Sequence, residues 1–301
     1  MALWNVGGGI KHYNHLITMN DNAKQLYDTP HNFFNSVFDS TFGLRWNGGR
    51  ICHPHDSVTI EDFMHIIMSY NEQGIGFNFT FSNRLLTEED MKDEYCNLLC
   101  EAAVSSGTKK QNGVITASPI LRNYIRKTYP ELKVIWSVCN GINKLDAYNA
   151  ETNNPLNDIV VLHPDYNHDY KFLQQLENKD RLEVMVNDIC AFGCPYRAKH
   201  YDQLSQFALL QATNPIIHRA IELDRGRPQD CEAIARGMVK DGRNKLSFSD
   251  LDLMEDMGFV HFKLIGREHD WDYYYKTDLF PNLEQRWIQN IIKTQNLNHH
   301  I

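Results

Sequence analysis

The segment from residue 187 to residue 201 holds the residue types best suited to chemistry. Cys190 and Cys194 stand four positions apart, directly after an apolar run that predicts a β-strand. Two thiolates at this spacing can bind one metal ion or cluster, although two thiols packed in a core would give the same spacing. Arg197 is a candidate for substrate binding, because a guanidinium can donate two parallel hydrogen bonds to an anionic group. The candidate catalytic residues of the segment are Asn187, Asp188, His200 and Tyr201.

A four-ligand metal site needs two more donors than this pair of cysteines supplies. Cys231, between Asp230 and Glu232, is the third candidate. For the fourth we consider Cys139, which ends a predicted strand, and Cys52, which follows one, with a slight preference for Cys139. The two other cysteines, at 96 and 100, are spaced four apart in a predicted helix, and we expect them to pack in the core.

Seven short runs rich in Val, Ile and Phe predict buried β-strands that would position these side chains. They cover residues 38–46, 74–82, 113–117, 133–138, 158–162, 182–186 and 259–265. Helix signals lie between them, such as Ser118 followed by Pro119, a cap residue ahead of a first-turn proline.

Strands that alternate with helices predict a parallel sheet. A weak strand candidate between about residues 216 and 238 would complete a set of eight. The expected fold class is therefore α/β, a (β/α)₈ TIM-like barrel with an irregular seventh strand. An open doubly wound sheet is the alternative, although no Gly-x-Gly-x-x-Gly follows the first predicted strand.

No linker-like stretch divides the 301 residues, so we expect residues 1–301 to form a single barrel domain. Residues 1–36 are expected to be an N-terminal flanking segment, residues 37–287 the barrel core and residues 288–301 a C-terminal tail. The formal net charge of −8 argues against a whole-surface attraction to nucleic-acid backbone. With no apolar leader and no apolar run long enough to span a membrane, the protein is expected to be cytoplasmic without a membrane partner.

Parallel barrels place their functional side chains at the carboxyl ends of the strands. The predicted strand ends are polar here, which favours an enzyme over a scaffold. His163 follows one predicted strand and Lys263 lies in the last one, and both are candidate catalytic residues. The remaining candidates for substrate binding are Arg45, Asn47, Asn83 and Arg267. We expect the basic residues among all these candidates to bind an anionic group such as a carboxylate or phosphate.

Three stretches of the sequence resemble the U32 peptidase-like family. They are Leu246–Leu251 (LSFSDL), Met257–Arg267 (MGFVHFKLIGR) and Leu182–Asn187 (LEVMVN), the last leading into the cysteine pair. The resemblance implies a barrel that holds a [4Fe–4S] cluster on four cysteines and hydroxylates its substrate without O₂. It also implies that Cys190, Cys194 and Cys231 lie in cluster-ligand regions, and that Lys263 and Arg267 are the family's basic pair. Asn187 and Asp188 replace a histidine and a glycine of the family pattern.

The leading hypothesis is thus an iron–sulfur barrel enzyme that hydroxylates a small-molecule or nucleic-acid-derived substrate. A zinc-binding barrel hydrolase is an alternative, with Zn²⁺ on the same three cysteines and a histidine such as His200. A non-catalytic accessory subunit with a structural cluster and a protein partner is another.

Overall fold

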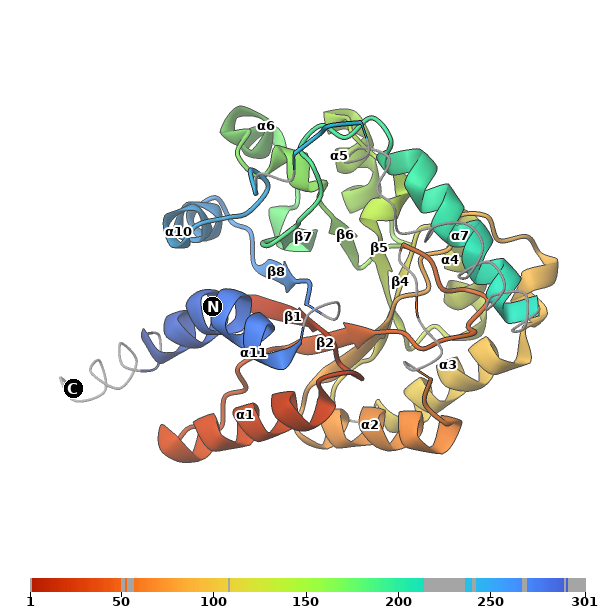
Figure 1. Ribbon diagram of the computed structural model, residues 1–301, viewed down its shortest axis with the longest axis horizontal. Coiled ribbons are helices and arrows are strands. Elements are labelled where there is room, and N and C mark those ends of the chain that lie inside the picture. Colours follow the sequence, from red (N-terminus) through yellow and green to blue (C-terminus); the bar gives the residue numbers. More distant parts are fainter. Residues whose placement is uncertain are drawn as a thin grey trace.

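Eight parallel strands close into a barrel in chain order, from β1 to β8 (Figure 1). The computed structural model describes residues 2–49, 52, 57–107, 109–213, 236–239, 242–266, 270–289 and 291. The strands are β1 Leu3–Gly7, β2 Ser36–Asp39, β3 Gly76–Phe79, β4 Gly113–Thr116, β5 Lys133–Trp136, β6 Ile159–Val161, β7 Leu182–Met185 and β8 His261–Leu264. Helices alternate with them, so the predicted (β/α)₈ barrel is confirmed.

The strand that the sequence did not predict is the first one, β1. Residues 1–36 were expected to flank the barrel, but they contain β1 and the first helix. Trp4 pairs with Phe262 of β8, and Val6 pairs with Val37 of β2, so β1 closes the barrel. Its apolar run is short, interrupted by Asn5 and followed by three glycines, which explains why the pattern is weak. The weak candidate at 216–238 lies almost wholly outside the described residues, and the barrel closes without it.

The helices surround the barrel, with α1 and α2 side by side on one flank (Figure 1). They are α1 Tyr13–Leu26, α2 Ile60–Glu72, α3 Glu94–Ser106, α4 Pro119–Thr128, α5 Leu145–Asn153, α6 Tyr170–Gln175, α7 Arg197–Thr213, α10 Phe248–Asp256 and α11 Trp271–Tyr274, with a π-helix over Tyr275–Glu284. As predicted, Ser118 caps α4 by accepting a hydrogen bond from the Leu121 amide, and Pro119 begins the helix. None of the helices in the described ranges is both long and apolar enough to span a lipid bilayer.

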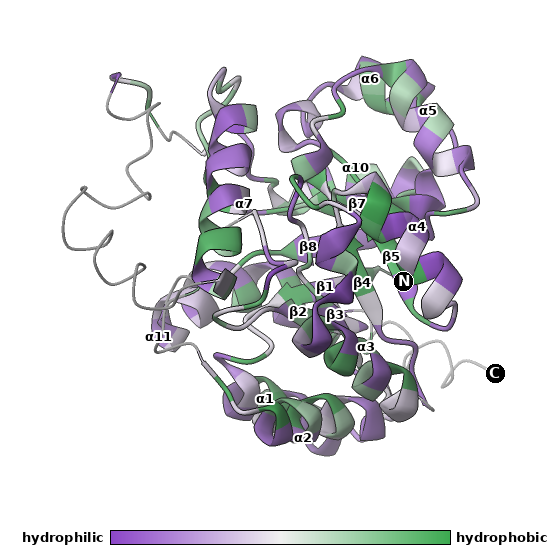
Figure 2. Cartoon of the chain, turned by 90° about the vertical axis from the view of Figure 1, so that its right-hand side faces the viewer, coloured by the Kyte–Doolittle hydropathy of each residue, from purple (hydrophilic) through white to green (hydrophobic). Residues whose placement is uncertain are grey.

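Two apolar clusters follow from the alternation of side chains along the strands. The larger lies between strands and helices, and hydrophobic and hydrophilic residues alternate along those helices in Figure 2. The smaller is formed by residues at the alternate strand positions: Phe38, Ile115, Ile135, Ile159, Val161 and Met185. These side chains fill the barrel below the mouth, as in other parallel barrels of this strand number.

A buried ion pair also lies within the barrel. The Lys263 ammonium is 3.3 Å from the Glu183 carboxylate, and Asn5 donates a hydrogen bond of 2.9 Å to the same carboxylate. The ammonium also lies 4.0 Å from the centre of the Phe38 ring. Lys263, which was expected among the catalytic and anion-binding residues, forms this interior pair one residue before the end of β8.

We predict that Lys263→Met destabilises the protein, because the Glu183 carboxylate would stay buried without its counter-charge. Breaking a buried ion pair costs about 3–5 kcal/mol. The double variant Lys263→Met/Glu183→Gln should recover part of that loss in urea unfolding. Additive losses from the two single variants would contradict a direct pairing.

Candidate active site

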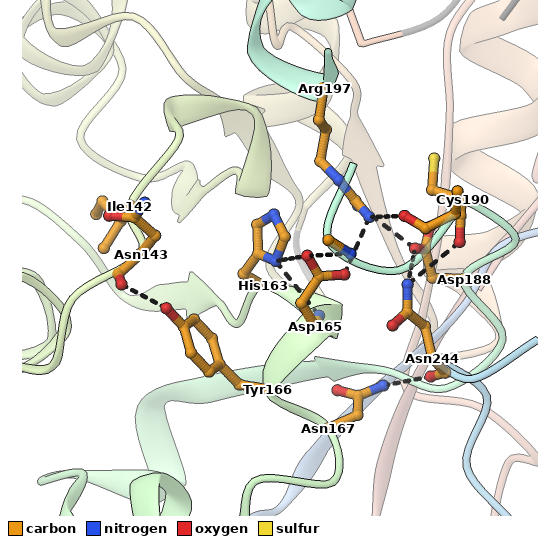
Figure 3. Close-up of polar contacts among 12 residues, drawn as sticks. Ile142, Asn143, His163, Asp165, Tyr166, Asn167, Asp188, Cys190, Arg197 and Asn244 are labelled. Atoms are coloured by element: carbon orange, nitrogen blue, oxygen red, sulfur yellow. Dashed lines mark hydrogen bonds and ion pairs between the residues drawn. The ribbon is translucent and has the colours of Figure 1, made fainter. Parts of the chain in front are cut away.

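One guanidinium joins the carboxyl ends of β6 and β7 (Figure 3). Arg197, the first residue of α7, lies 3.3 Å from the carboxylate of Asp165 and 3.4 Å from that of Asp188. Asp165 follows β6 and Asp188 follows β7. The Arg197 and Asp188 side chains are 7% and 5% exposed. Charges this deeply buried need partners, and these three groups supply them to one another.

The same side chains fix the segment that carries the two cysteines. The Gly193 amide donates to the Asp165 carboxylate at 3.1 Å, and Arg197 donates to the Ala191 carbonyl at 3.5 Å. Asn244 donates to the Cys190 carbonyl at 3.3 Å. Buried or half-buried side chains therefore hold the backbone at positions 190, 191 and 193, between Cys190 and Cys194.

Two asparagines brace this arrangement from the side of β7. Asn244 also donates to the Asp188 carboxylate at 3.1 Å, and Asn167 donates to the Asn244 carbonyl at 2.6 Å (Figure 3). A second hydrogen bond from Asn167 reaches the Met185 carbonyl at 2.8 Å. The β6–α6 loop, the end of β7 and the segment before α10 are thereby tied together.

A pocket of about 640 Å³ opens beside this network. Its lining comes from three connections that follow β5, β6 and β7. The described lining residues are Asn143, His163, Asp165, Tyr166, His168, Asp169, Phe192, Gly193 and Cys194. A candidate base and a candidate metal ligand, His163 and Cys194, thus share one cavity at the carboxyl ends of the strands, where parallel barrels bind their substrates.

Burial and the neighbouring guanidinium set the protonation state of this site. Burial, together with the charge of Arg197, lowers the pKa of His163 to about 4, while Asp165 opposes the shift. The imidazole is therefore neutral near pH 7. Its Nδ1 accepts the Asp165 amide hydrogen at 3.3 Å, so the ring proton is on Nε2. Burial raises the pKa of Asp188, and Arg197 and Asn244 oppose that rise.

The phenol of Tyr201, on α7, lies within electrostatic reach of Cys139, Cys190 and Arg197. Burial raises its pKa well above the usual value, and negative charge on Cys139 or Cys190 would raise it further. Tyr201 therefore lies near both thiols. Cys139 is buried in the short helix Val138–Asn140, and burial raises its pKa. The Cys52 sulfur accepts a hydrogen bond from Asn47 at 3.1 Å.

Three predicted substrate-binding residues lie around the β2–α2 and β3–α3 connections instead. Arg45 pairs with Asp90 at 2.9 Å and with Asp93 at 3.2 Å. Asn83 donates to the backbone carbonyls of Arg45 and Ser205. With Asn47 bonded to Cys52, all three make structural contacts, and none is among the described residues that line the 640 Å³ pocket.

The other predicted residues divide between the site, its edge and the part of the chain outside the described residues. Asn187 bonds both the amide and the carbonyl of Ile265, joining the ends of β7 and β8. His200 lies one turn into α7. Cys231 and Arg267 lie outside the described residues. Within the described ranges, no group of three or more His, Cys, Asp or Glu side chains could hold a metal ion.

Comparison with known proteins gives information about the fold alone. No family model matches the sequence, and no curated protein sequence matches it. A solved structure described as that of a U32 peptidase superposes with a TM-score of 0.50 over 88% of this chain and 93% of the other, at 15% sequence identity. The two proteins share a fold. The U32-like fold implied by the sequence resemblance is therefore supported, and the neighbour's described activity belongs to that protein.

Of the residues that hold the site together, Arg197 and Asp188 were candidates from the sequence, whereas Asp165, Asn167 and Asn244 were not. Asp165 stands two positions after His163 at a strand end, a signal that could have marked it. Asn167 and Asn244 carry no comparable signal, because they meet across 77 positions of the chain and lie in loops.

We predict that Arg197→Met loosens the cysteine segment, because Asp165 and Asp188 would be left buried without their shared counter-charge. The free energy of unfolding should fall by about 3–5 kcal/mol. Amide hydrogen exchange of residues 189–194 should become faster than in the unsubstituted protein. Unchanged exchange in this segment would contradict its anchoring by Arg197.

We also predict a pH-dependent contribution of His163 to stability. The unfolded chain binds a proton at this residue near pH 6.5, whereas the folded protein does so only near pH 4. Stability should therefore decrease as the pH falls from 6.5 to 4, by up to about 3 kcal/mol. Urea unfolding of the unsubstituted protein and of His163→Gln across this range isolates the effect. An NMR titration that gave His163 a pKa of 6.5 or higher would refute it.

Proposed function

We propose that this chain is an iron–sulfur enzyme that modifies a small-molecule or nucleic-acid-derived substrate in the 640 Å³ pocket. One observation carries the proposal: the backbone between Cys190 and Cys194 is held by buried charged and polar side chains at the edge of that pocket. Fixing the ligands before a metal arrives reduces the cost of ordering them. Hydroxylation without O₂ is the reaction that the family resemblance implies.

The donor chemistry of the site fits such a cluster. Thiolates are the usual ligands of iron–sulfur clusters, and positive charge favours the thiolate over the thiol. The Arg197 guanidinium is near enough to Cys190 for the thiolate to raise the arginine's pKa, so the same attraction favours that thiolate. We propose Cys190, Cys194 and Cys231 as ligands and Cys139 as the fourth, since Tyr201 lies near both Cys139 and Cys190. A bound cluster would supply electron transfer or a Lewis-acidic iron.

The protein's own groups have distinct roles in this proposal. The neutral His163 can donate a hydrogen bond from Nε2 or exchange a proton with a substrate in the pocket. Tyr201, whose pKa is raised, stays protonated and can donate to a thiolate or a bound substrate. Arg197 holds the segment and Asp188 holds Arg197, so both act by positioning.

Anaerobic reconstitution with iron and sulfide tests the proposal. We expect visible absorbance and about four iron atoms per chain, the content of a [4Fe–4S] cluster. Cys190→Ser and Cys194→Ser should each reduce the iron content severalfold, and Cys231→Ser and Cys139→Ser test the other two proposed ligands. Cys96→Ala is the matched control, because Cys96 is buried in α3 among core residues and should leave iron binding unchanged.

Two outcomes would overturn this function. A protein that stays colourless and free of iron after reconstitution is not an iron–sulfur enzyme. Stoichiometric zinc bound without iron, and lost in the Cys190 and Cys194 variants, would favour the zinc hydrolase.

A further inference from the structure

The described lining of the pocket carries negatively charged side chains and no lysine or arginine. Asp165 and Asp169 supply carboxylates, and none of the described lining residues is Lys or Arg. His163 adds no positive charge near neutral pH, since its pKa is about 4. An anion in this pocket would therefore face carboxylates without a lysine or arginine among the described lining residues to offset them.

The nearby guanidiniums do not reverse this sign. Arg197 is shared between two carboxylates, Asp165 and Asp188, and so leaves one formal negative charge in the buried network. Arg243 lies over the Phe192 ring, 4.7 Å from its centre. With Asp169 included, three carboxylates stand against two guanidiniums around the pocket. A positive charge brought by a ligand would balance this excess.

The lining also offers groups that favour a cation. Phe192 is 40% exposed, and its contact with Arg243 indicates that this ring already attracts positive charge. Asp169 caps α6 with one carboxylate oxygen, which accepts the Phe172 amide at 3.1 Å. Its other oxygen has no hydrogen-bond partner among the described residues and can accept one from a ligand. Tyr166 stacks on Phe172 at 4.0 Å and gives the wall a fixed flat surface.

We infer that the pocket takes a small molecule with a cationic amine, which lies against Asp169 and the Phe192 ring. This inference deepens the proposed function, on which it rests, by naming the substrate's charge. It also reverses the expectation of an anionic ligand, because the described basic residues that were to bind one, Arg45, Arg197 and Lys263, are paired with carboxylates.

Three probes of matched size test the sign directly: benzylamine, benzyl alcohol and benzoate. Binding to the full chain, before and after anaerobic reconstitution, can be followed by ligand-detected NMR. We expect benzylamine to bind at least about tenfold more tightly than benzoate, which corresponds to about 1.4 kcal/mol. The affinity for benzyl alcohol should lie between those for benzylamine and benzoate.

Asp169→Asn removes the charge and keeps the helix cap, because asparagine caps helices as well as aspartate does. We expect it to weaken benzylamine binding several-fold and to leave benzyl alcohol unaffected. Asp270→Asn is the matched control: Asp270 caps α11 by accepting the Tyr273 amide at 2.9 Å and is not among the described lining residues. It should change neither affinity.

Benzoate binding as tight as that of benzylamine, or equal effects of the two substitutions, would overturn the inference. Because amine binding is measured without the cluster as well, the two proposals can fail separately. Selective amine binding by a chain that never binds iron would refute the iron–sulfur function and leave the amine site standing. A chain that binds iron but prefers benzoate would refute the amine site and leave the iron–sulfur function standing.

Discussion

The guanidinium of Arg197 between two buried carboxylates is the interaction on which the candidate site depends. It fixes the loop after β6 against the end of β7, at 3.3 Å and 3.4 Å from Asp165 and Asp188. Charges inside a protein are tolerated only when they are paired and hydrogen-bonded, so the three groups must stay together. Because Asp165 also accepts the Gly193 amide, this requirement extends to the backbone between the two cysteines. The conformation of the cysteine segment is therefore fixed by charged side chains that lie outside it.

The fold was predictable where strands are continuous apolar runs. The seven predicted runs became β2 to β8, because strands buried on both faces need apolar residues at nearly every position. β1 escaped the same reasoning, because its apolar run is short, is interrupted by Asn5 and is followed by glycines. With β1 unrecognised, only seven strands were predicted, and residues 216–238 were proposed as the eighth strand of the barrel. The eighth strand is instead β1.

The candidate pocket lies where the sequence predicts one, at the strand ends beside the cysteine segment, but the pairing of the charged residues around it was not predictable. Arg45, Arg197 and Lys263 have the right type and neighbourhood for binding an anion, and the sequence does not reveal that each is already paired. Each has a partner carboxylate 45, 32 or 80 positions away, on another element, so only the folded chain brings these pairs together. Such pairing is the usual fate of a buried cation. A charged residue at a strand end therefore indicates that a binding site lies at the rim of the barrel, but it does not indicate the charge of the ligand.

Arg197 joins the geometry of the site to its proton chemistry. Burial lowers the pKa of His163, and the charge that holds Asp165 and Asp188 lowers it further, so Arg197 contributes both to the ordered segment and to the neutral imidazole. Lysine could supply the charge, but a single ammonium lacks the planar fork that reaches two carboxylates and the Ala191 carbonyl together. The buried network still carries one more carboxylate than guanidinium, and an approaching cation would relieve that excess. The same network of two carboxylates and one guanidinium thus fixes the cysteine segment and favours a positively charged ligand.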